Sequence, residues 1–179
     1  MRKLKKIFLN TSGNELVEMA VMMPVLFSVL LAIFYFGRAY NIYGTITQAA
    51  IQGARAAVVT QCATCGNAAL PADQIATNIV GPALRASHLD PAAVTYTQPN
   101  LCPCGSAGAC TAVTCDSLGT GASPSICVQQ NVRLTNTVGT AQACGTAVSF
   151  NYPYNFNLPF QMFTLNLKAA AQMQSENQQ

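Results

Sequence analysis

A basic leader followed by a long apolar run constrains this chain more than any other feature. Residues 1–12 carry four basic side chains: Arg2, Lys3, Lys5 and Lys6. No charged residue then occurs between Glu18 and Arg38. A helix needs about 20 apolar residues, each rising about 1.5 Å, to cross the hydrocarbon core of a bilayer. The sequence therefore predicts one membrane-spanning helix, with its membrane part at about residues 16–37.

The distribution of charge predicts the orientation of this span and bears on which classes of partner are expected. Positively charged flanks stay on the cytoplasmic side, which places the long C-terminal part on the far side of the membrane. Four of the nine basic residues lie in the leader, which leaves five against six acidic residues, a net charge of −1. Because no basic patch exists outside the leader, nucleic acid is not an expected partner.

The cysteines predict a disulfide-linked domain in an oxidising compartment. The chain has eight of them, all in its second part, and a dense, even set beyond a membrane signal is typical of secreted disulfide frameworks. The spacing leaves the pairing open, although Cys102 and Cys104 are expected to have separate partners because they are so close in sequence. The eight are Cys62, Cys65, Cys102, Cys104, Cys110, Cys115, Cys127 and Cys144.

Redox and metal chemistry are weaker interpretations of the same cysteines. Cys62 and Cys65 have the spacing of a redox pair, but the βαβ context of such a site is missing. The cysteines of residues 102–115 do not form the repeated C-x-x-C pairs of a zinc site. We therefore predict disulfides here, and neither a metal site nor a cofactor.

The predicted helix extends well beyond the membrane. Pro24 removes one backbone hydrogen bond, and we expect a kink near residues 21–23 but no break. Small and apolar residues then recur at helical spacing up to about residue 60, which gives a helix of roughly 70 Å. Ala49, Gly53 and Ala57 form a small-residue ridge. This ridge fits packing against the chain's own domain, with packing between subunits as the alternative.

The rest of the chain predicts an α+β domain, in which the long helix packs on a small, mostly antiparallel sheet with disulfide-linked loops. Pro71 and the residues after it favour a second helix, weakened or interrupted at Gly81-Pro82. Residues 100–125 read as a loop. The segment from Tyr152 to Phe160 reads as a Pro- and aromatic-rich connection. The expected elements are a helix at 72–86 and strands at 93–97, 126–135, 146–152 and 163–173.

No catalytic constellation is predicted. His88 is the single histidine. A catalytic site needs a nucleophile, a base and an orienting group, and one histidine with scattered acids does not suggest such a set. We expect His88 to be a surface residue after the second helix, and the isolated aspartates, Asp73, Asp90 and Asp116, to serve in caps and turns.

The block from Gly13 to Ala20, followed by Pro24, resembles the class III signal of type IV pilin-like proteins. It is most similar to the TadE-like pseudopilins of tight-adherence (Flp/Tad) pilus systems. Residues 36–41 and 52–55 resemble the continuation of that family, and the specific likeness covers about residues 13–59. The cysteine-rich loop is not a feature that the resemblance explains.

The resemblance implies a non-enzymatic pilus subunit with three parts: a prepilin leader (1–13), a long N-terminal helix (14–60) and an extracytoplasmic domain (61–179). A prepilin peptidase would cut between Gly13 and Asn14. Glu18 would then pair with the freed amino group of a neighbouring subunit. The implied partners are other pilin-like subunits, the prepilin peptidase, the inner-membrane assembly platform and the lipid bilayer. The implied location is the bacterial inner membrane, with the domain in the periplasm and then on a cell-surface pilus.

Two other functions fit the same sequence. The chain could be an uncleaved, single-pass membrane anchor for a periplasmic binding domain that recognises its ligand through the disulfide-rich loop. It could also be an extracytoplasmic redox protein that uses Cys62 and Cys65. An ordinary secretory signal fits less well, because the apolar run is long and no small-x-small cleavage site follows it.

Overall fold

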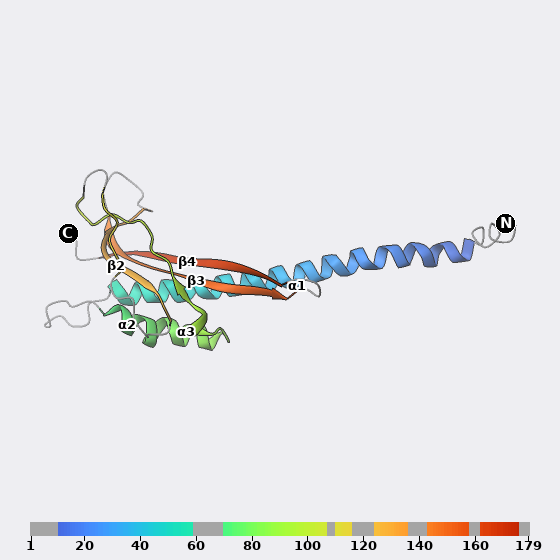
Figure 1. Ribbon diagram of the computed structural model, residues 1–179, viewed down its shortest axis with the longest axis horizontal. Coiled ribbons are helices and arrows are strands. Elements are labelled where there is room, and N and C mark those ends of the chain that lie inside the picture. The colour runs from blue at the N-terminus through green and yellow to red at the C-terminus, as the bar shows by residue number, and fades with distance from the viewer. Residues whose placement is uncertain are drawn as a thin grey trace. The chain divides into compact units, whose positions relative to one another are not determined.

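The computed structural model describes residues 11–58, 70–106, 110–115, 124–135, 143–157 and 162–175. The chain divides into two compact units, Met1–Tyr40 and Asn41–Gln179. Helix α1 (Thr11–Val58) contributes to both units. Figure 1 shows the elements of each unit along the chain.

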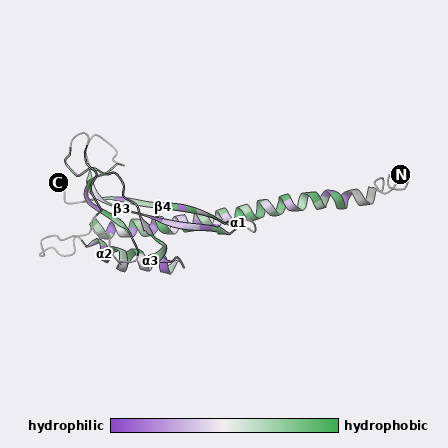
Figure 2. Cartoon of the chain, viewed as in Figure 1, coloured by the Kyte–Doolittle hydropathy of each residue, from purple (hydrophilic) through white to green (hydrophobic). Residues whose placement is uncertain are grey.

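The first unit consists, in its described part, of the N-terminal portion of α1. This portion is apolar and its side chains from Glu15 onward are largely exposed, and Figure 2 shows mostly hydrophobic colours along it. The helix is long and apolar enough to cross a membrane. It runs through Pro24 without interruption, in line with the tolerance of proline in membrane helices.

In the second unit, the remainder of α1 supplies the core of the domain. Its ridge of small residues is buried by the chain's own sheet and second helical segment, which confirms packing within the domain. A Cβ atom placed on Gly53 would lie 3.0 Å from Cγ2 of Val80 and 3.6 Å from Cγ1 of Val148. Glycine therefore permits this close approach. The α1 residues in the core are Ile46, Ala49, Ala50, Ala54 and Ala57.

The second helical segment has the predicted bounds and an irregular middle. It consists of α2 (Ala72–Ile75), the π-helical turn η1 (Ala76–Val80) and α3 (Gly81–Ala86). The amide of Gly81 donates to the carbonyl of Ala76, five residues back. Pro82 has no amide hydrogen to continue the α-helical pattern. The wider turn carries the chain up to the proline without a break.

Among the described residues, four antiparallel strands form one sheet, with β3 (Cys144–Asn157) in its interior. One side of β3 pairs with β4 (Met162–Gln174) along the whole length of the hairpin. The other side pairs first with β2 (Cys127–Arg133) and then with β1 (Thr95–Tyr96). A short 3-10 helix, η2 (Pro91–Ala93), precedes β1, and the Asp90 carboxylate accepts a hydrogen bond from the amide of Ala92 at 2.9 Å.

The prediction of a connection from Tyr152 to Phe160 is wrong, because β3 continues to Asn157. Pro153 lies opposite Asn166 of β4. On its other side, the last described partner of β3 is Thr95, opposite Asn151. At Pro153 the strand has therefore reached an edge, where the missing amide hydrogen interrupts no ladder.

The two faces of the sheet bury different parts of the chain. Val148, Phe150 and Ala169 face α1 and the second helical segment, in the main core. Val132 and Ala147 pack on the opposite face with Leu101. A bulge between Gln129 and Val132 brings Val132 onto this face, because it inserts one residue into β2 and reverses the alternation of side chains.

Candidate functional site

The first candidate site is the start of α1, which contains three positions that the sequence analysis singled out. Gly13 and Asn14 lie in the first turn of the helix, which begins at Thr11. Glu18 lies farther along and is exposed. The part of the chain that the structure describes offers its carboxylate no ion-pair partner. Cleavage after Gly13, the role of Glu18 and the kink at Pro24 stay predictions.

The chemistry at this end of α1 is unusual for a membrane-spanning helix. Glu15 and Glu18 are three residues apart and therefore neighbours on the helix surface. Carboxylates within a span are costly unless they find a partner, and they mark functional positions in membrane proteins. The hydrophobic side chains that follow them are exposed as well. This end of α1 therefore exposes an apolar surface and also carries carboxylates that would need a partner within a membrane.

A comparison with protein families identifies this segment. The model of the family described as TadE-like protein matches residues 13–55. Over this segment the chain is TadE-like. The match begins at the glycine of the predicted cleavage site and falls within α1. Neither a curated protein nor a solved structure matches the chain significantly.

The TadE-like family gives the chain a coarse functional setting. Proteins of this family are pilus-associated and structural, not enzymatic. Membership of a pilus-subunit family implies pilin-like partners for the proteins that belong to it, and α1 is a helix long and apolar enough to anchor the matched segment in a membrane. Residues 56–179 lie outside the match.

The second candidate site is the loop between β1 and β2, which three disulfides hold in place. Cys102 pairs with Cys110, Cys104 with Cys144, and Cys115 with Cys127, with Cα–Cα distances of 5.6, 5.6 and 5.1 Å. These bonds confirm the predicted disulfide-linked loops and the separate partners of Cys102 and Cys104. They also give a pairing that the sequence left open. Cys62 and Cys65 lie outside the described residues.

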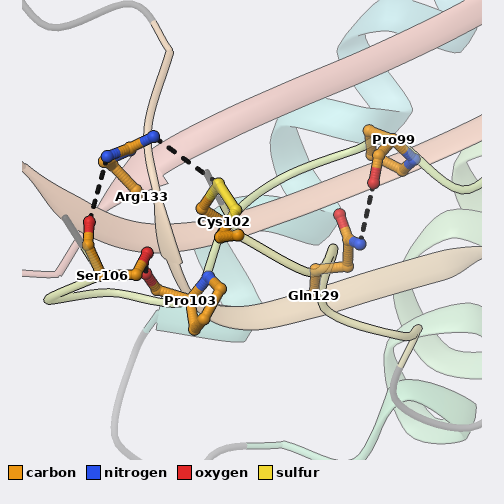
Figure 3. Close-up of a disulfide and its surroundings, with 7 residues drawn as sticks. Pro99, Cys102, Pro103, Ser106, Gln129 and Arg133 are labelled. Carbon is orange, nitrogen blue, oxygen red and sulfur yellow. Dashed lines mark hydrogen bonds between the residues drawn. A yellow bond between two sulfur atoms is a disulfide. The ribbon is translucent and has the colours of Figure 1, made fainter. Parts of the chain in front are cut away.

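Hydrogen bonds attach the same loop to β2. The Nε2 group of the buried Gln129 donates to the carbonyl of Pro99 at 3.0 Å and to that of Val113. Nη1 of Arg133 donates to the carbonyl of Ser106 at 3.1 Å, and Nη2 lies 3.5 Å from the Cys102 sulfur. Figure 3 shows both arginine contacts and the bond from Gln129 to Pro99. The loop is thus held against the sheet by side chains as well as by disulfides.

Sequence reasoning missed the roles of Gln129 and Arg133. Both lie in a predicted strand, where a polar residue is ordinarily assigned to the solvent face. The long loop before this strand is the sequence feature that could have indicated these roles. The carbonyl groups of a loop that packs on a sheet need hydrogen-bond donors that are buried with them. His88, in contrast, is exposed as expected. Its backbone φ of 59° is a feature that the sequence did not indicate.

Proposed function

We propose that this chain is a pilin-like structural subunit, a minor pseudopilin of a tight-adherence type IV pilus. The observation that carries the proposal is the coincidence of the TadE-like match, residues 13–55, with one membrane-capable helix, Thr11–Val58. The match includes the proposed cleavage site and continues into the helix portion that forms the core of the domain. Anchor and displayed domain therefore share one helix.

In the proposed pathway, a prepilin peptidase removes residues 1–13 and frees the α-amino group of Asn14. Glu18 is then the fifth residue of the mature chain. Its carboxylate pairs with the amino group of a neighbouring subunit at the same depth, because an unpaired charge is expensive in hydrocarbon. This pairing sets the axial register of the helices while the exposed apolar surface packs in the filament.

The proposed topology places the leader in the cytoplasm and the second unit in the periplasm before assembly. Two features support it: the basic leader and the three disulfides, which need an oxidising compartment. The inner-membrane assembly platform would receive the processed subunit and insert it into the pilus.

The N-terminus of the protein recovered from cells tests this proposal. We expect mass spectrometry of the membrane and sheared-pilus fractions to show Asn14 as the first residue. A Gly13→Leu variant serves as the control, because a bulky side chain at the cleavage position should leave the leader attached. Parent protein that keeps residues 1–13 in assembled pili would overturn the processing step and favour the uncleaved anchor.

A further inference from the structure

The Cys102–Cys110 disulfide is the most accessible of the three disulfides that the structure describes. Each of the other two has one buried cysteine, Cys127 in one bond and Cys144 in the other. Cys102 and Cys110 are both half-buried. Access to the sulfur atoms is one of the factors that set the rate of thiol–disulfide exchange. An external thiol therefore reaches this bond more readily than the other two.

A guanidinium group makes the two sulfur atoms of this bond unequal. Nη2 of Arg133 lies 3.5 Å from the Cys102 sulfur, while Nη1 donates to the carbonyl of Ser106 at 3.1 Å (Figure 3). In the described part of the chain, no carboxylate forms an ion pair with this guanidinium. A neighbouring positive charge stabilises a thiolate, and a disulfide breaks faster when the departing sulfur becomes the more stable thiolate. Arg133 therefore favours Cys102 as the leaving group and Cys110 as the sulfur that is attacked.

The backbone keeps Cys102 beside the guanidinium independently of the Cys102 disulfide. The carbonyl of Cys102 accepts a hydrogen bond from the amide of Arg133 at 2.8 Å. Two residues later, the amide of Cys104 donates to the carbonyl of Asn131 at 2.8 Å, and the side chain of Cys104 is bonded to Cys144. Because none of these contacts involves the exchanging bond, they persist when it opens. The released thiolate then stays next to the positive charge that stabilises it.

From these observations we propose that the Cys102–Cys110 disulfide is a thiol-exchange site, at which an external thiolate attacks the Cys110 sulfur. A bond forms between the external sulfur and Sγ of Cys110, the Cys102–Cys110 bond breaks, and its electron pair leaves on the Cys102 sulfur beside Arg133. The external thiolate comes from a small thiol or from the dithiol of a two-cysteine oxidoreductase. The inference concerns the second unit alone and does not depend on the pilus role.

With a dithiol the exchange runs to completion in a second step. The second thiolate of the reagent attacks the reagent's own sulfur in the mixed disulfide and releases Cys110 as a thiolate. The dithiol is thereby oxidised to a disulfide, and Cys102 and Cys110 are reduced by the same two electrons. The two protons that the dithiol loses balance the two that the cysteines take up.

Trapping the mixed disulfide tests both the site and the direction of attack. Full-length protein in detergent is treated briefly with reduced glutathione, N-ethylmaleimide then blocks the released thiol, and mass spectrometry of peptides locates both groups. We expect glutathione on Cys110 and maleimide on Cys102 before either of the other two described disulfides reacts. Glutathione on Cys102 would overturn the direction of attack. Earlier reaction at either of the other two disulfides would overturn the site.

A second reagent distinguishes the two sources of the external thiol. A two-cysteine oxidoreductase whose second cysteine is replaced by serine stops at the mixed disulfide, so its adduct can be located in the same way. Faster attachment to Cys110 than glutathione shows, at equal thiol concentration, would support an oxidoreductase as the partner. Slower attachment would support a small thiol, and reaction with neither reagent would overturn the exchange site.

Variants of Arg133 test the role of the guanidinium. Arg133→Met removes the charge, so exchange at Cys110 should slow at least about threefold and part of the glutathione should move to Cys102. Arg133→Lys restores the charge and should restore the preference for Cys110. Arg85→Met is the matched control, because Arg85 is exposed on α3, outside this loop, and this variant should exchange like the parent.

The rate separates a chemical role of Arg133 from a structural one. A loop that had merely loosened would exchange faster, so an unchanged or increased rate in Arg133→Met would overturn the assigned role. If Arg133→Met fails to fold, the position of glutathione in the parent protein still decides the direction of attack.

Discussion

At the scale of single residues, His88 shows how a surface position can limit stability. The amide of Leu89 donates to the carbonyl of Leu84, and the amide of His88 donates to that of Arg85. Together these bonds form the Schellman cap that ends α3, and they require the residue at His88 to adopt a positive φ. A side chain with a Cβ atom pays for that conformation with about 1 kcal/mol.

His88→Gly should therefore stabilise the domain. Removal of about 1 kcal/mol of strain is partly offset by the chain entropy that glycine adds to the unfolded state, so we expect the Tm of the full-length protein in detergent to rise by about 1–2 °C. Ser87→Gly is the control, because Ser87 is exposed, precedes His88 and has a φ of −101°. Glycine there adds only chain entropy to the unfolded state and should lower the Tm. A fall of similar size in both variants would contradict the strain at His88.

At the scale of elements, the loop between β1 and β2 is held by disulfides that close chain segments of different lengths. The Cys104–Cys144 disulfide closes a segment of 40 residues and joins the loop to β3, whereas Cys102–Cys110 closes only 8 residues. A cross-link stabilises a fold mainly by restricting the unfolded chain, so the longer closure contributes more.

Replacing the two cysteines of each bond by alanine should separate these contributions. We expect the Cys104→Ala/Cys144→Ala protein to lose about 4 kcal/mol of unfolding free energy and the Cys102→Ala/Cys110→Ala protein about 2.5 kcal/mol. Denaturant unfolding of the full-length chain, followed through the circular dichroism of the sheet, measures both. The reverse order, with the shorter closure costing more, would show that local packing around Cys102 outweighs chain entropy.

The elements also show where sequence reasoning succeeds and fails. The bounds of the second helical segment and of β2 and β4 follow from local signals, such as Pro71 and alternating β-formers. The extension of β3 through Pro153 does not, because it depends on which neighbouring strand stops first. The cysteine pairing is likewise a property of the assembled sheet. Local preferences cannot encode either feature.

At the scale of the whole molecule, one helix serves both the anchor and the core. The motif around Gly13 and Glu18 could be recognised from sequence, since its meaning lies in spacing and charge. The partner of Glu18 could not, because the carboxylate has none in the described part of a single chain. In the proposed assembly a neighbouring subunit completes this site, so a single chain would leave it incomplete.

Glu18→Ala should accordingly affect assembly and not insertion. Removing one charge makes the span more apolar, so membrane extraction should recover the variant at the parental level. Incorporation into sheared pili should fall at least about tenfold, since the loss of a buried charge pair costs several kcal/mol. Ser28→Ala, a similarly small change at an exposed position within the same span, should assemble normally. Undiminished incorporation of Glu18→Ala would remove the pairing role.

Pro153 has a consequence for how copies of this chain can associate. A strand that tried to extend the sheet beside β3 beyond Asn151 would meet a position with no hydrogen to donate, and one of its carbonyls would remain unpaired. Pro153 therefore opposes edge-to-edge strand pairing between copies along this edge of the hairpin. Copies that associate at this edge would do so through side-chain contacts and not through an extended, amyloid-like sheet.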